Sequence, residues 1–170
     1  MIATEIHQRT RHWVLDPARS SVTFAVGTFW GLGTVRGHFD SFDGFYEAGP
    51  EGGQIELTVD AESIDTGNER RDEHLRSWDF FDVVRHREVR FTSTRVIDTG
   101  GGRLLVAGNL EAAGKSVPVE VDAELKHVGD EIEIEAEATV DQNGFDMSTG
   151  PFGMIRTPAT VNVKARLVSE

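Results

Sequence analysis

The sequence contains no cysteine. Disulfide bonds, thiolate zinc sites, iron–sulfur clusters and thiol nucleophiles are therefore excluded. It also lacks any run of about 20 apolar residues, the length that a membrane-spanning helix requires. The first residues, MIATEIHQRTRHWVLD, hold no apolar stretch of the kind found in a signal peptide. We therefore expect a cytoplasmic protein without stable membrane insertion.

Basic residues are few compared with acidic ones. The chain has 17 Lys and Arg against 29 Asp and Glu, and its formal net charge is −12. A nucleic-acid backbone or an anionic membrane surface would be repelled, so we expect no nucleic-acid partner. A length of 170 residues is typical of one domain that holds its own core. We predict a flexible polar tail over residues 1–11 and a single domain over residues 12–170.

Motifs of common enzyme and cofactor sites are missing as well. The histidines form no His-x-His or His-x-x-x-His pair; they stand at His7, His12, His38, His74, His86 and His127. There is no Gly-x-Ser-x-Gly elbow and no Gly-x-Gly-x-x-Gly fingerprint between a strand and a helix. We therefore predict no bound metal, no cofactor and no catalytic residue.

The dominant pattern in the chain is alternation of apolar and polar residues. It is sharpest in VPVEVDAEL and EIEIEAEATV, at residues 117–125 and 131–140, with the hairpin turn HVGD between them. Similar segments cover residues 21–26, 53–64, 87–98, 104–112 and 159–168. In residues 88–98, the alternation predicts Val89, Phe91, Ser93, Arg95 and Ile97 on one face. Together the segments predict an all-β, antiparallel barrel of about eight strands, with a charged outside and an apolar inside.

One stretch, RRDEHLRSWDFF at residues 70–81, breaks this alternation. Thr66 and Glu69 have the spacing of a capping box, and Arg71, Leu75 and Trp78 fall on one helical stripe. We predict one short helical segment near residues 69–81. In an all-β chain, such a segment has to lie against an end or a side of the barrel.

Small residues recur on the predicted inner faces, at Gly108, Ala112, Ala123, Ala136 and Ala138. A barrel of about eight strands is wide enough either to be filled by side chains or to hold one small ligand. Small inward residues fit a hollow barrel, and they fit the taper of a packed one equally well. Both readings stay open at this point.

The order of several motifs resembles the YceI-like family of bacterial lipid-binding proteins. These motifs are WVLDPARSSVTF at 13–24, VRGHF at 35–39, SIDTGNERRDEHLRSWDFFDV at 63–83, FTST at 91–94, GNL at 108–110 and SVPVEV at 116–121. The resemblance implies a lipocalin-like barrel that encloses a long isoprenoid chain, of the polyprenyl or isoprenoid-quinone kind, in an apolar tunnel. It therefore implies a carrier or store without catalysis. Arg19, Arg87, Ala113, Gln142 and Asp146 depart from the family pattern.

The resemblance and the inward apolar positions together predict a set of lipid-binding residues. Leu75, Trp78, Phe80 and Phe81 would cover the tunnel, while Arg70, Arg71 and Asp72 would fix the helix to the barrel. The full predicted set is Phe24, Val26, Phe29, Trp30, Leu32, Phe39, Phe42, Ile64, Leu75, Trp78, Phe80, Phe81, Phe91, Val106, Val121, Ala136, Ala138, Phe145 and Met147.

Two other classes of function remain as alternatives. One is a small barrel enzyme in which His74 works with Asp72 or Asp79 as acid and base, since titratable groups concentrate there. The other is a packed barrel that serves as an interaction module, with Phe29, Trp30 and Leu32 as the contact patch. For the assembly we hypothesise a homodimer, because dimers are common among such barrels.

Overall fold

The computed structural model describes residues 10–27, 33–50, 52–78, 80–141 and 159–170. The helical elements are the 3₁₀ turns η1 (Pro17–Arg19) and η3 (Ala61–Ser63) and the helix α2 (Glu69–Arg76). The strands are β1 (Arg11–Leu15), β2 (Ser21–Gly27), β3 (Thr34–Phe39), β4 (Phe42–Gly49), β5 (Gly52–Asp60), β6 (Ile64–Asp65), β7 (Glu88–Gly100), β8 (Arg103–Ala112), β9 (Lys115–Val128), β10 (Glu131–Val140) and β11 (Ala159–Ser169). Within these ranges, no helix is both long enough and apolar enough to cross a membrane.

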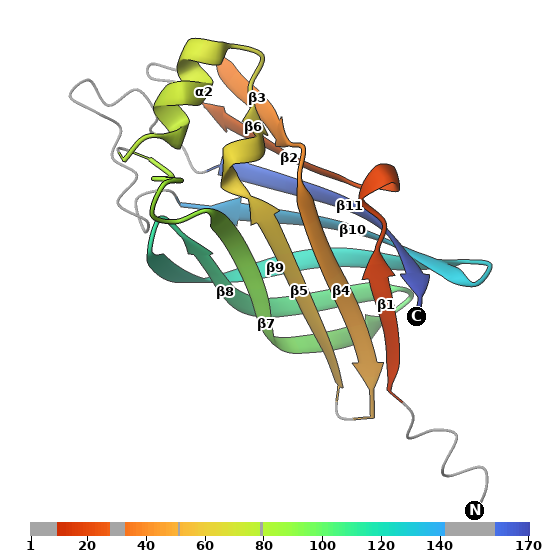
Figure 1. Ribbon diagram of the computed structural model, residues 1–170. Helices are drawn as coiled ribbons and strands as arrows, with labels where there is room; N and C mark the ends of the chain where they lie inside the picture. The colour runs from red at the N-terminus through yellow and green to blue at the C-terminus, as the bar shows by residue number, and fades with distance from the viewer. Residues whose placement is uncertain (1–9, 28–32, 51, 79, 142–158) are drawn as a thin grey trace, which may run out of the picture.

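The strands form a closed antiparallel barrel (Figure 1). Eight of them make the ring, in the order β1, β4, β5, β7, β8, β9, β10 and β11, and β11 returns to β1. The strand β11 pairs with β1 near its C-terminal end and with β2 nearer its start. The sheet then extends from β2 to β3 and from β3 to β6. The prediction of an antiparallel barrel of about eight strands with one short helix is confirmed.

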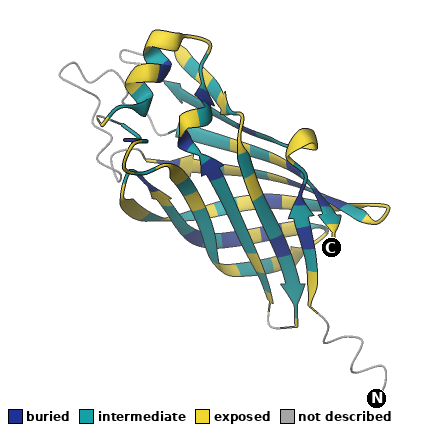
Figure 2. Cartoon of the chain, viewed as in Figure 1, coloured by how far each residue is buried: buried dark blue, intermediate teal, exposed yellow. Residues whose placement is uncertain are grey.

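The predicted inner faces of β9, β10 and β11 are correct. Along β10, Ile132 and Ile134 are buried while Glu135 and Glu137 are exposed. Figure 2 shows the same alternation of buried and exposed positions along the other strands of the barrel. The strand segments form because residues two apart share a face, which buries the apolar set and leaves the acidic set in water.

The predicted inner face of β7 is wrong in its second half. The pairing of β7 with β8 shifts register between Ser93 and Arg95, which marks a β-bulge. One extra residue reverses the alternation, so Val96 packs against the core and lies opposite the buried Val106. The positions of Arg95 and Ile97, predicted to face inward, therefore lie on the other face.

Helix α2 lies at the end of the barrel where β2, β3 and β6 extend (Figure 1). It begins at Glu69 as predicted and ends at Arg76, shorter than the predicted segment. The N-cap is Asn68, whose side-chain oxygen accepts a hydrogen bond from the backbone N–H of Arg71 at 3.0 Å. The predicted capping box with Thr66 does not form, because the chain enters the helix through Asn68.

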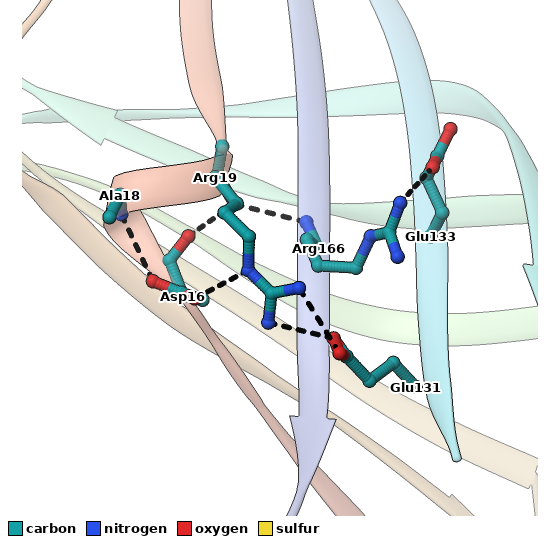
Figure 3. Close-up of polar contacts among 7 residues, drawn as sticks. Asp16, Ala18, Arg19, Glu131, Glu133 and Arg166 are labelled. Carbon is teal, nitrogen blue, oxygen red and sulfur yellow. Dashed lines mark hydrogen bonds and ion pairs between the residues drawn. The ribbon is translucent and has the colours of Figure 1, made fainter. Parts of the chain in front are cut away.

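An ion-pair network fixes η1 to the outside of the barrel (Figure 3). Arg19 Nε donates to Asp16 at 2.8 Å, and its terminal nitrogens lie 3.1 and 2.7 Å from the two carboxylate oxygens of Glu131. Beside this network, Arg166 pairs with Glu133 at 2.9 Å. The hydrogen bonds from Arg19 lower the pKa of both Asp16 and Glu131. Arg19, which departs from the family pattern, thus links η1 to β10 through Glu131.

We expect this network to make stability depend on pH in the acid range. A carboxylate with a lowered folded pKa contributes stability above its ordinary pKa of about 4, and that contribution is lost as pH falls through the folded value. An Arg19→Met variant should therefore melt at a modestly lower temperature than the wild type at pH 7. The difference should shrink between about pH 5 and about pH 2.

Thermal melts followed by circular dichroism measure this difference. The control is Arg95→Met, an exposed arginine for which the structure shows no ion pair with a described residue. A difference between wild type and Arg19→Met that stays constant down to pH 2 would show that the network does not titrate in this way.

Candidate functional site

The barrel encloses two adjoining apolar voids. The first, here the deep void, has a volume of about 140 Å³ and is walled by residues of β1, β4, β5 and β7 to β11. The alanines Ala123, Ala136, Ala138 and Ala165 are part of its wall. Because alanine side chains end at Cβ, they leave space along the barrel axis that leucine or phenylalanine would fill. The described part of the barrel is therefore hollow.

The second, here the outer void, has a volume of about 180 Å³ and lies under α2. Phe24 and Val26 of β2 form part of its wall, together with Leu75 of α2. Phe80 and Phe81, which follow the helix, complete the wall on that side. Phe81 also meets Phe39 edge to face, with ring centroids 6.0 Å apart. Aromatic side chains from both the barrel and the helix segment thus enclose this space.

The two voids share Leu57, Leu110, Val140 and Val161. Along β10, Ile134, Ala136 and Ala138 line the deep void and Val140 lines both voids. The strand β8 runs through both in the same way, from Val106 past Leu110 to Ala112. The voids therefore follow each other along the barrel and adjoin at these four shared residues.

The end of the barrel away from α2 is packed. Trp13, Leu104 and Ile132 belong to the buried core but line neither void. Trp13 stacks on Tyr46 with ring centroids 5.6 Å apart, and burial raises the pKa of the Tyr46 hydroxyl. The hollow space is thus closed by side chains at this end.

The walls suit an apolar ligand. Among the described residues that line the two voids, Glu56 alone carries a charge. One of its carboxylate oxygens lies 3.8 Å from Arg90, a partly exposed ion pair. Binding in such a cavity has to come from removal of apolar surface from water, with selectivity set by shape.

The segment around α2 covers the outer void. We call residues 69–78 and 80–87 the cover segment. Asp72, buried at 5% exposure, accepts hydrogen bonds from the backbone N–H and hydroxyl of Thr66 at 3.0 and 2.5 Å. Arg71 and Arg76 also attach the helix: Arg71 donates to Thr66, and Arg76 donates to the carbonyl oxygens of Glu62 and Ile64. Polar contacts of the helix thus hold the apolar wall in place.

The structure brings most predicted site residues together. Seven of them line the outer void: Phe24, Val26, Phe39, Ile64, Leu75, Phe80 and Phe81. Five line the deep void: Phe91, Val106, Val121, Ala136 and Ala138. Phe29, Trp30, Leu32, Phe145 and Met147 lie outside the described residues.

Two predicted site residues lie elsewhere. Phe42 packs against the core cluster and lines neither void. Trp78 lines neither void either, and it is 77% exposed. The prediction that Trp78 covers the tunnel is corrected: it follows the end of α2, where the helical stripe that would have turned it inward has stopped.

The four residues shared by the voids were absent from the predicted site. Leu57, Val140 and Val161 stand at inward positions of the alternating pattern, which is the one sequence feature that points to them. Alternation marks every inward residue in the same way. It does not reveal which inward residues stand where two voids meet.

Titratable groups near α2 were the basis of the enzyme hypothesis. The carboxylate of Asp72 accepts hydrogen bonds from Thr66. The ring of His74 packs edge to face on the ring of Phe80, with centroids 5.0 Å apart. Asp79 lies outside the described residues. One group in the described chain has the composition of metal ligands, namely His38, Asp40 and Asp65. His38 Nε2 lies 3.0 Å from a carboxylate oxygen of Asp40 and 3.8 Å from one of Asp65.

The chain has clear relatives among known proteins. Residues 13–168 match the model of the YceI-like domain. A UPF0312 protein of Vibrio campbellii is 33% identical over 135 residues, which cover 76% of this chain and 71% of that protein. The family match thus covers the barrel from β1 to β11.

Solved structures share the fold at low sequence identity. BcnA of Burkholderia cenocepacia superposes with a TM-score of 0.81 at 20% identity, covering 89% of this chain and 98% of BcnA. A polyisoprenoid binding domain from Saccharophagus degradans, implicated in plant cell wall breakdown, superposes with a TM-score of 0.75 at 15% identity. That match covers 96% of this chain and all of the domain (100%).

Proposed function

The chain belongs to the YceI-like family, and on this premise we propose that it binds a long-chain isoprenoid-type lipid inside the barrel, as a carrier or store. The observation that carries the proposal is the pair of adjoining apolar voids. They share four wall residues, and among the described residues of their walls a single one is charged. The polyisoprenoid-binding relative from Saccharophagus degradans supports the class of ligand. Binding of this kind needs no catalytic residue.

The energetics favour a long apolar chain over a small polar molecule. Each methylene moved from water into the cavity contributes about 0.8 kcal/mol, while association costs about 4–15 kcal/mol. A ligand therefore has to bury on the order of ten or more chain carbons before binding is tight. A chain would have to extend along the barrel axis through both voids to bury that many carbons.

Organic extraction of protein purified without added lipid tests the proposal. We expect mass spectrometry of the extract to show a prenyl-type lipid, and native mass spectrometry to show the matching mass on the intact protein. Protein that is empty after repeated purification, and that takes up no prenyl lipid when mixed with it, would refute the proposal. The same native spectra give the oligomeric state and so test the predicted homodimer.

A further inference from the structure

Two large apolar side chains project from the cover segment into solvent. Trp78 is 77% exposed and Val84 is 94% exposed. In the described part of the chain, the other exposed large apolar residues are Leu105 at 37% and Val128 at 43%. The two most exposed members of this group thus stand six positions apart in one short segment.

This segment has an inner and an outer apolar side. Leu75, Phe80 and Phe81 face the barrel and line the outer void, whereas Trp78 and Val84 face solvent. The opposite end of the barrel is closed by the packed core around Trp13. The outer void therefore lies at the same end of the barrel as the segment that carries Trp78 and Val84, and the packed core lies at the other end.

The charge of the cover segment differs from that of the rest of the chain. The cover segment taken together with Asp79, residues 69–87, contains five arginines and five acidic residues, so the net charge of this stretch is zero: Arg70, Arg71, Arg76, Arg85 and Arg87 against Glu69, Asp72, Glu73, Asp79 and Asp82. The remaining residues carry the whole net charge of −12. The cover segment therefore adds no net charge repulsion toward a lipid surface, whereas the remaining chain repels anionic groups.

We propose that Trp78 and Val84 dock the protein on the surface of an uncharged lipid bilayer and bring the outer void against the source of its ligand. This inference rests on the proposed function. Tryptophan suits the membrane interface because its ring is apolar and its N–H can stay hydrated. Two side chains give shallow, reversible contact, which a carrier needs for release.

Flotation with vesicles of pure phosphatidylcholine tests the docking surface. The double variant Trp78→Ser with Val84→Ser should lower vesicle association by roughly tenfold, because it removes the apolar contacts. The matched control is Leu105→Ser with Val128→Ser, which removes the other two exposed apolar residues and should leave association unchanged. Circular dichroism confirms that both variants fold. Added phosphatidylserine should weaken wild-type binding, because the chain is acidic.

A transfer assay separates this inference from the proposed function. Prenyl lipid is offered either in the vesicles or dispersed from ethanol in buffer. The Trp78 and Val84 double variant should take up lipid more slowly from vesicles and at the wild-type rate from dispersion. Failure of the wild type to take up lipid from either source would refute the proposed function, while flotation alone would still decide the docking surface.

Three results would overturn the docking surface. The first is wild-type protein that does not float with phosphatidylcholine vesicles, or a double variant that floats equally well. The second is loss of uptake from dispersion as well, which would make Trp78 and Val84 part of the cavity cover. The third is a dimer in the wild type that becomes a monomer in the double variant by light scattering, which would make the patch a contact between two copies.

Discussion

Replacing Ala138 with Phe is expected to prevent most lipid uptake while the protein stays folded. Ala138 lines the deep void and lies opposite Val161, which lines both voids. A phenyl ring at this place would exclude about five chain carbons, and at about 0.8 kcal/mol each their loss weakens binding by about 4 kcal/mol, roughly a thousandfold. Because the ring enters space that is empty, the free energy of unfolding should change by less than about 1.5 kcal/mol.

The control for Ala138→Phe is Glu137→Phe. Glu137 is the neighbouring residue on β10 and is exposed, so the same ring is added to the outer face of the same strand. Titration with a prenyl lipid, followed by native mass spectrometry, should give wild-type affinity for Glu137→Phe. Ala136→Phe should behave like Ala138→Phe, because Ala136 also lines the deep void. Wild-type affinity in both alanine variants would place the ligand outside the deep void.

The sequence predicted the barrel because its strands bury one face and expose the other. In β10, every second residue from Ile132 to Val140 is apolar, and the register that pairs it with β9 and β11 keeps this set inside. A shift by one residue would expose the apolar set and bury the glutamates, so the pattern alone determines the face. The same pattern could not predict the β7 bulge. A bulge depends on pairing with β8, which lies outside the local sequence of β7.

In the cover segment, the spacing of residues in the sequence predicted the start of α2 but not its end. The helix starts at Glu69 as predicted, but Ser77 ends it: its backbone N–H and hydroxyl both bind the carbonyl oxygen of His74, at 3.1 and 2.5 Å. These bonds and the turn that follows replace the helical hydrogen bonds that would have extended α2 to Trp78. The helical face that holds Arg71 and Leu75 therefore does not reach Trp78. Sequence spacing predicted Trp78 as cover, whereas the observed end of α2 leaves it in solvent.

The hollow interior could not be deduced from composition. Inward alanines such as Ala123 and Ala136 fit a packed barrel if larger side chains from facing strands reach them. They fit a hollow one if those side chains do not. The answer depends on distances across the barrel, and these are set by strand number and tilt and not by any one strand. The resemblance to the YceI-like family favoured the hollow form.

Replacing Ile132 with Ala is expected to destabilise the protein strongly. Ile132 is 1% exposed and lines neither void, so its side chain is enclosed by the core cluster that includes Trp13 and Leu104. Removing a buried isoleucine side chain costs the transfer free energy of the lost groups and leaves a new cavity. Together these lower the free energy of unfolding by about 3–4 kcal/mol, out of a total of about 5–15 kcal/mol for a domain. Urea denaturation measures this change.

The matched comparison is Val163→Ala, on β11, whose loss in the free energy of unfolding is measured in the same way. Val163 is only partly buried and lines the deep void, so its outer methyl groups already face empty space and have fewer neighbours to lose. Glu135→Ala, on the outer face of β10, controls for strand propensity and should change stability little. We expect the Ile132 variant to lose clearly more stability than the Val163 variant, even after scaling for the number of carbons removed. Equal loss per carbon would mean that the barrel is packed uniformly along its axis, and the lipid would then have no space to enter.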